Sequence, residues 1–221
     1  GRMPAAPAAD AHGEDASKWS RLPLAPREDE AYAIVSQVNY VAAGCRLFEP
    51  GEIADFGAAS VASRALSLGY LWDNVRVAGG AYGGGCALNP TSGGFAFSSY
   101  RDPNLQATLD IYAAAADALS ESDISAEALE QAIVGMVGDL DKPLTPDQKG
   151  QRALNWHLTG VTTAMRQEFR DQVLGCSPEA FRAFAERLRK AKLSVSVFGS
   201  EEALAAANAK RETPLPVKKI V

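Results

Sequence analysis

The chain is poor in the residues that usually bind metals, with only two histidines and three cysteines among its 221 residues. Neither His12 nor His157 belongs to an HExxH or HxxEH motif, so no metallopeptidase zinc site can be assembled from this chain alone. The three cysteines are widely spaced and form no CxxC pair, which excludes a local zinc knuckle or dithiol redox motif (Cys45, Cys86 and Cys176). We expect no metal bound by this chain and three reduced, mostly buried thiols.

The chain also lacks a long apolar run and an excess of positive charge. No stretch approaches the roughly 18 consecutive apolar residues needed to cross a bilayer, so we expect no membrane span. Lysine and arginine total 22 and aspartate and glutamate total 27, which gives a net charge of -5. Because binding to phosphates needs a basic face, nucleic acid is not the expected partner. A basic or amphipathic peptide is compatible with this charge.

Three glycine-containing functional motifs are incomplete or absent. The segment Gly79–Gly85 is rich in glycine, but a dinucleotide-binding GxGxxG motif that starts at Gly83 would end on Leu88. A P-loop needs lysine after its second glycine, and Cys86 stands there. No GxSxG sequence is present either. Nucleotide binding and serine hydrolysis are therefore poor interpretations of this sequence.

Composition and periodicity divide the chain into two parts. Residues 1–29 are rich in Ala, Pro, Asp and Ser and show no periodicity, which is typical of a linker or disordered tail. Residues 30–221 carry regular apolar patterns and are predicted to form one domain.

Strands are predicted first. The β-branched and aromatic run 30–43 predicts one long strand. Segments 82–88 and 95–100 flank the turn-forming residues 89–94 and predict a hairpin. A further short strand is expected at 193–198.

Helices fill most of the remainder. Segment 54–68 is rich in alanine and predicts a helix, and a second short helix is expected at 70–77. Helix-start signals predict further helices from Asp102, Ser125, Thr145, Ser177 and Ser200. The helix from Asp102 has one apolar stripe, formed by Leu105, Leu109, Tyr112, Ala116 and Leu119. This order of elements predicts an α+β fold with a mainly antiparallel sheet covered by a helical layer.

The segment from Leu71 to Asp102 is the most informative for function. Arg76 ends a predicted helix, and Tyr82 begins a strand after a glycine bend, so the two side chains can converge on one side. A guanidinium and a phenol can donate hydrogen bonds to a carbonyl oxygen or a developing oxyanion. The alternative from spacing alone is a solvated Arg76 and a Tyr82 in the core. Neighbouring Trp72 and Tyr100 are predicted to pack in the core or at a hinge.

Four sequence segments resemble the last domain of the presequence proteases, which are pitrilysin-type metallopeptidases. The first two are LWDNVRVAGGAYGGG (71–85) and SSYRDPNLQATLDIY (98–112). The other two are VNYVA (38–42) and AIVGMVGDLDKP (132–143), and all four occur in the family's order. The resemblance runs from about residue 31 to residue 198.

The resemblance implies an enzyme of two halves that close around a peptide. The N-terminal half, absent from this chain, binds the zinc cofactor, and this half lends Arg76 and Tyr82 to hold the substrate backbone and stabilise the oxyanion. Gly79, Gly80 and Gly83 support substrate binding. The implied partners are the zinc-binding half and short unfolded peptides such as presequences or transit peptides. The implied location is an organelle interior, the mitochondrial matrix or plastid stroma.

Two functions remain open on these residues. In the first, the chain is the C-terminal portion of a zinc metalloendopeptidase and is not catalytic alone. In the second, the chain is a non-catalytic scaffold or core subunit of the same superfamily. Retention of both Arg76 and Tyr82 favours the first, because a pure scaffold has no need of them.

Overall fold

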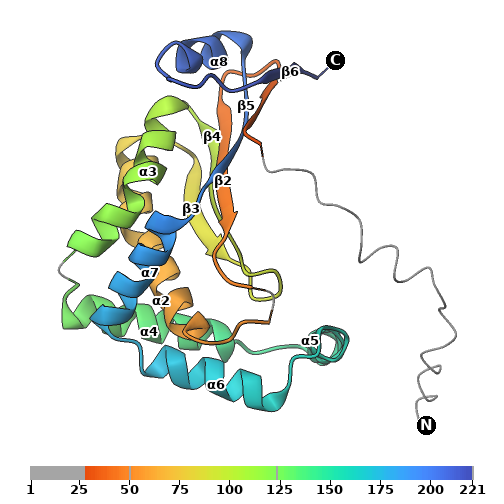
Figure 1. Cartoon of the computed structure of the whole chain (residues 1–221). Helices are drawn as coiled ribbons and strands as arrows, with labels where there is room; N and C mark the ends of the chain where they lie inside the picture. Colours follow the sequence, from red (N-terminus) through yellow and green to blue (C-terminus); the bar gives the residue numbers. More distant parts are fainter. Residues whose placement is uncertain (1–27, 50, 123, 221) are drawn as a thin grey trace, which may run out of the picture.

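The computed structural model describes residues 28–49, 51–122 and 124–220 (Figure 1). The predicted linker, residues 1–29, lies outside this part apart from its last two residues. The described residues contain a six-stranded sheet with the strand order β3-β4-β2-β5-β1-β6. The strands are β1 (Glu30–Ala33), β2 (Asn39–Arg46), β3 (Gly83–Leu88), β4 (Gly94–Asp102), β5 (Ser194–Gly199) and β6 (Val217–Lys219).

The sheet is mixed, with most of its length antiparallel. Strand β2 pairs antiparallel with β4 and β5, and β3 pairs antiparallel with β4. Strand β1 pairs parallel with β5 and β6. The predicted α+β class with a mainly antiparallel sheet is therefore confirmed, and the predicted hairpin is the β3–β4 pair.

The single long strand predicted at 30–43 is wrong. The segment forms two strands, β1 and β2, and β5 lies between them in the sheet. The chain turns at Ser36, whose hydroxyl donates to the carbonyl of Val38 (2.7 Å) and accepts from its N–H (3.1 Å). Serine side chains that bond nearby backbone compete with strand pairing in this way. The short strand β6 was also not predicted.

The helices cover one face of the sheet. Figure 1 shows α2, α3 and α7 packed on the same side of it. The helical elements are α2 (Phe56–Leu66), η2 (Ser67–Ala78), α3 (Gln106–Glu121), α4 (Ala126–Leu140), α5 (Pro146–Thr159), α6 (Thr163–Leu174), α7 (Pro178–Lys190) and α8 (Glu201–Asn208). No helix within the described ranges is long and apolar enough to cross a membrane.

The core lies between the sheet and these helices. Phe95 and Phe97 of β4 are buried, and their rings contact each other at 4.8 Å. Phe97 stacks on Tyr112 of α3 at 4.8 Å, and Phe95 meets Phe184 of α7 at 5.7 Å. The predicted apolar stripe of α3 is confirmed, because its five residues are buried. Alternation on the strand and a stripe on the helix thus produce one shared core.

Several helix boundaries differ from expectation. The short helix predicted at 70–77 is part of η2, a π-helix that continues α2 without a break. The helix predicted from Asp102 begins instead at Gln106. Helix α6 was not predicted, because its few apolar residues give no clear stripe. The predicted starts at Ser125 and Ser200 are confirmed, since each hydroxyl accepts from a first-turn N–H, and Thr145 forms the predicted capping box.

Candidate functional site

Arg76 and Tyr82 flank a tight bend between η2 and the sheet. Arg76 lies in the last turn of η2, and its carbonyl accepts from the N–H of Gly80 at 3.0 Å. The chain then reverses, and the N–H of Ala81 donates to the carbonyl of Val75 at 3.1 Å. Tyr82 follows and immediately precedes β3. The bend therefore fixes the two candidate residues at the junction of a helix end and an edge strand.

Glycine is required at specific positions around this bend. Gly80 has φ +79°, a backbone conformation that side chains disfavour. At Gly79, a Cβ would meet the carbonyl oxygen of Val75 at 2.6 Å. At Gly84 and Gly85, a Cβ would lie within 2.6 Å of side-chain atoms of η2, so these glycines let β3 pack directly on that helix. The supporting role predicted for Gly83 has no steric basis, because a Cβ there meets nothing within 4 Å.

Polar contacts hold the bend against the rest of the domain. The side-chain amide of Asn104 donates to the carbonyl of Gly79 at 2.6 Å. The N–H of Asn104 in turn donates to the Asp102 carboxylate at 2.9 Å. Asp102 is fully buried and also accepts from the hydroxyl of Thr108 at 2.7 Å. The helix therefore does not start at Asp102 as predicted. The Asp102 carboxylate orders the loop that precedes α3, and Asn104 links this loop to the bend.

Each candidate side chain packs against a different aromatic ring. The guanidinium of Arg76 lies 4.2 Å from the ring centre of Trp72. The Tyr82 ring is 68% exposed and makes an edge contact with Tyr100 at 6.0 Å, so the alternative of a core Tyr82 is wrong. Trp72 and Tyr100 are 38% and 52% exposed, which also rules out the predicted core packing.

The donors of both candidate residues are free to bind a ligand. Within the described part of the chain, neither the guanidinium of Arg76 nor the hydroxyl of Tyr82 hydrogen-bonds another protein group or forms an ion pair. Stacking on Trp72 restrains the arginine without using its N–H groups. The arrangement supplies exposed, partly ordered donors of the kind that bind a carbonyl oxygen or an oxyanion.

The thiols of this region are unsuited to nucleophilic chemistry. Cys86 of β3 donates to the carbonyl of Ser63 at 3.2 Å, and burial raises the pKa of the Cys86 thiol to about 12. Burial likewise raises the pKa of Cys176 to about 11. Since the thiolate is the reactive form, both groups are inert at neutral pH. Cys45 and Cys176 are buried and Cys86 is half-buried, in line with the prediction of mostly buried thiols.

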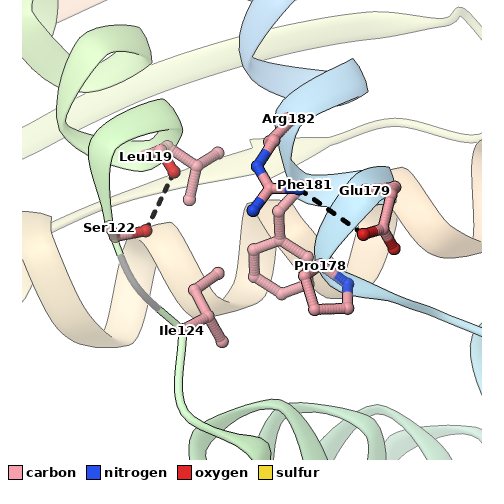
Figure 2. A pocket seen from close by; sticks show the side chains of 7 residues that line it. All are labelled: Leu119, Ser122, Ile124, Pro178, Glu179, Phe181 and Arg182. Atoms are coloured by element: carbon pink, nitrogen blue, oxygen red, sulfur yellow. Dashed lines mark hydrogen bonds and ion pairs between the residues drawn. The ribbon is translucent and has the colours of Figure 1, made fainter.

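The described residues offer no alternative centre for chemistry. No group of three or more His, Cys, Asp or Glu side chains among them could hold a metal ion. His157 lies in the last turn of α5 and is exposed. Figure 2 shows a hollow of about 170 Å³ between the end of α3 and the start of α7. Its polar groups already pair with each other, as Arg182 does with Glu179, and it is smaller than usual ligand pockets.

Several residues of the site were missed by sequence reasoning. Asn104 and the two glycines Gly84 and Gly85 carry no local signal that would reveal their contacts. Tyr100 could have been found, because it alternates with buried Ser99 on β4 and must face the other side of the sheet.

Comparisons with known proteins identify the family. The family model described as the PreP C-terminal domain matches residues 29–199. The chain is 43% identical over 202 residues to presequence protease 1, chloroplastic/mitochondrial, of Arabidopsis thaliana. This match covers 90% of the chain but only 18% of that relative.

Solved structures agree on the fold at low sequence identity. An inactive domain of peptidase M16 from Pseudomonas fluorescens has a TM-score of 0.61 at 16% identity, covering 85% of this chain and 45% of that one. Pitrilysin has a TM-score of 0.56 at 15% identity, covering 88% of this chain and 22% of that one. The chain therefore belongs to the presequence-protease family, of which it carries the PreP C-terminal domain.

Proposed function

We propose that this chain is the metal-free C-terminal portion of a zinc metalloendopeptidase that degrades presequences, transit peptides and other short unfolded peptides. The observation that carries the proposal is the pair Arg76 and Tyr82, exposed at one bend with unpaired donors. The name of the Arabidopsis relative supports a place inside an organelle, the mitochondrial matrix or the plastid stroma. Because the chain spans a fifth or less of such relatives, the rest of the enzyme is a necessary partner.

The metal belongs to the other half in this proposal. The described residues of this chain do not fit a zinc ion, because they contain no cluster of suitable ligands. When bound in the N-terminal half, zinc would supply the activated water for peptide hydrolysis. The work of this chain is to hold the substrate and stabilise charge.

The geometry suits two donors that act on the substrate backbone. Arg76 is restrained by Trp72, and Tyr82 by Tyr100, so little side-chain freedom is lost when a peptide binds. Asn104 and the glycines fix the bend from which both project. When the scissile carbonyl becomes tetrahedral, its oxygen gains charge and binds such donors more tightly. Each donor placed there contributes about 3 kcal/mol to the transition state.

The test is turnover of a presequence peptide by the longer enzyme that contains this chain. Arg76→Ala and Tyr82→Phe should each lower kcat by about tenfold to a thousandfold, with a smaller change in KM. Arg166→Ala is the control, because Arg166 of α6 also stacks on a tryptophan, Trp156 of α5, at 4.0 Å but lies on helices other than η2. Its turnover should equal that of the unmodified enzyme.

The rival function predicts a different outcome. If the chain is a scaffold, both variants assemble normally and leave turnover unchanged, as the Arg166→Ala control does. That result would remove the assigned roles of Arg76 and Tyr82. Circular dichroism of each variant separates this outcome from loss of folding.

A further inference from the structure

The face of the sheet opposite the helices carries a row of aromatic side chains. Strand residues that point to the helices are buried, and the residues between them point to the other face. On that face, one end of the strands carries an aromatic residue on each successive strand from β4 to β1. We call this the aromatic row; it consists of Tyr82, Tyr100, Tyr40, Phe198 and Tyr32.

The row is continuous in space and begins at the candidate site. Tyr82 contacts Tyr100 at 6.0 Å, and Tyr100 contacts Tyr40 at 5.4 Å, both edge-on. Tyr40 is the register partner of Phe198, which stacks on Tyr32 at 4.8 Å. Neighbouring strands lie about 4.8 Å apart, so the row crosses roughly 20 Å of the sheet.

Three phenols of the row are available to a ligand. The hydroxyls of Tyr82, Tyr100 and Tyr40 have no hydrogen-bond partner within the described ranges. By contrast, the two tyrosines outside the row have hydrogen-bonded hydroxyls. Tyr70 donates to the carbonyl of Ile111, and Tyr112 donates to the carbonyl of Val41. Exposure is greatest at the end nearest the candidate site, where Tyr82 and Tyr100 are 68% and 52% exposed.

The described strand positions beside the row carry small side chains. On the same face, the strands continue with Ala42, Gly44, Ala96 and Ser98. Small side chains allow another backbone to approach closely. Tyrosines beside such a surface give large, rigid contact area at low entropic cost, as in antibody paratopes.

The charges beside Tyr82 indicate which side chain fits. The carbonyl of Arg101, which directly follows Tyr100, accepts from the N–H of Tyr82 at 3.3 Å, and Arg76 lies across the bend from Tyr82. Both arginines are exposed, and neither forms an ion pair in the part of the chain that the structure describes. Two unpaired positive charges disfavour a lysine or arginine of the ligand at this position. An aromatic or bulky aliphatic side chain meets no such repulsion and gains contact with the rings.

We propose that Tyr82, Tyr100 and Tyr40 form a subsite for a bulky apolar side chain of an extended peptide. This proposal rests on the function assigned above, because the same peptide backbone would be held by Arg76 and Tyr82. An apolar side chain is the occupant that fits, because the row is continuous with Tyr82 and the two arginines repel cations. The subsite gives the enzyme a preference for peptides with an apolar residue near the cleaved bond.

The first test measures peptide binding to the 221-residue chain without the zinc half. The probes are fluorescein-labelled peptides of about ten Gly, Ser and Ala residues, with Phe, Ala or Lys at one central position. The Phe peptide should bind about twofold to tenfold more tightly than the Ala peptide, and the Lys peptide no better than Ala. Tyr100→Ala should abolish the preference, while Leu158→Ala, at an exposed residue of α5, should keep it.

Every other result overturns the proposal. A chain that binds all three peptides equally, or none, has no apolar subsite. A preference that survives in Tyr100→Ala places the subsite elsewhere. Sedimentation that shows a dimer disrupted by Tyr100→Ala would assign the row to contact with a second copy.

The second test separates this proposal from the catalytic one. In the longer enzyme, Tyr100→Ala should raise KM for the Phe peptide by about twofold to tenfold relative to KM for the Ala peptide. Loss of the ring contact that restrains Tyr82 would instead change kcat for both peptides equally. Tyr100→Phe retains the ring and should behave as wild type. If Arg76→Ala left turnover intact while this selective KM effect remained, the catalytic role would fail and the subsite would stand.

Discussion

A pair of glycines in β3 tests whether close packing of the sheet on η2 positions the bend. Gly84 and Gly83 are neighbours in the same edge strand. A Cβ at Gly84 would lie 2.6 Å from Cγ1 of Val75, about 1 Å inside the usual contact distance. Val75 is fully buried and, being β-branched, is held in one rotamer by its helix. The added methyl must therefore displace β3 from η2.

The expected magnitude follows from this overlap. Overpacking of this kind costs about 1–3 kcal/mol, so Gly84→Ala should lower the free energy of unfolding by that amount. For a chain of this size, the melting temperature should fall by about 2–12 °C. Gly83→Ala meets no atom within 4 Å and should instead stabilise the protein by up to about 1 kcal/mol, through lower entropy of the unfolded chain.

Urea denaturation followed by circular dichroism measures both variants under identical conditions. The double variant Gly84→Ala/Val75→Ala should lose less unfolding free energy than the two single variants together. Removing the Val75 methyl groups makes room for the added Cβ, and that Cβ fills part of the space they leave. Equal stability of Gly84→Ala and wild type, or a stabilising effect no different from Gly83→Ala, would refute the claim that glycine is needed for close packing.

Two further predictions concern buried polar groups. Asp102→Ala should lower the free energy of unfolding by about 1–3 kcal/mol, because it leaves the buried Thr108 hydroxyl unpaired; additivity with Thr108→Val in urea denaturation would contradict this. The thiols of Cys86 and Cys176 should not react with a disulfide reagent at pH 8 until the protein unfolds. Since burial raises their pKa above 9.0, their contribution to stability is complete below pH 9 and is lost as pH rises toward 12. Rapid native-state labelling, or stability that rises above pH 9, would contradict this prediction.

Much of the local structure could be predicted because it depends on neighbouring residues. The apolar stripe of α3 and the alternation of Phe95 and Phe97 are periodic signals, and the caps at Ser125 and Ser200 are made by adjacent residues. The predictions failed where contacts with residues distant in the sequence determine the structure. Run 30–43 has strand composition throughout, yet β5 takes the place between its two halves.

The candidate site shows the same division. Glycines at the bend were evident from sequence, but which of them touch another element was not. Gly83 and Gly84 are indistinguishable in the run of glycines, and only the position of Val75 on η2 separates them. Trp72 and Tyr100 looked like core residues by type, whereas the structure exposes both and sets them against Arg76 and Tyr82.

By itself, the sequence determined the fold class and the lack of a metal motif, and through the family resemblance it named Arg76 and Tyr82 as candidate site residues. These depend on residue type and on spacing along the chain. Only the tertiary structure decided that hydrogen bonds of Asn104 and Asp102 hold the bend in place. It also decided that tyrosines from separate strands align beside Tyr82. Such contacts join residues far apart in the sequence, 63 positions for Asn39 and Asp102 and 166 for Tyr32 and Phe198, and they depend on strand order and register. No local pattern encodes that order, because strand pairing is chosen by burial of the whole sheet against its helices.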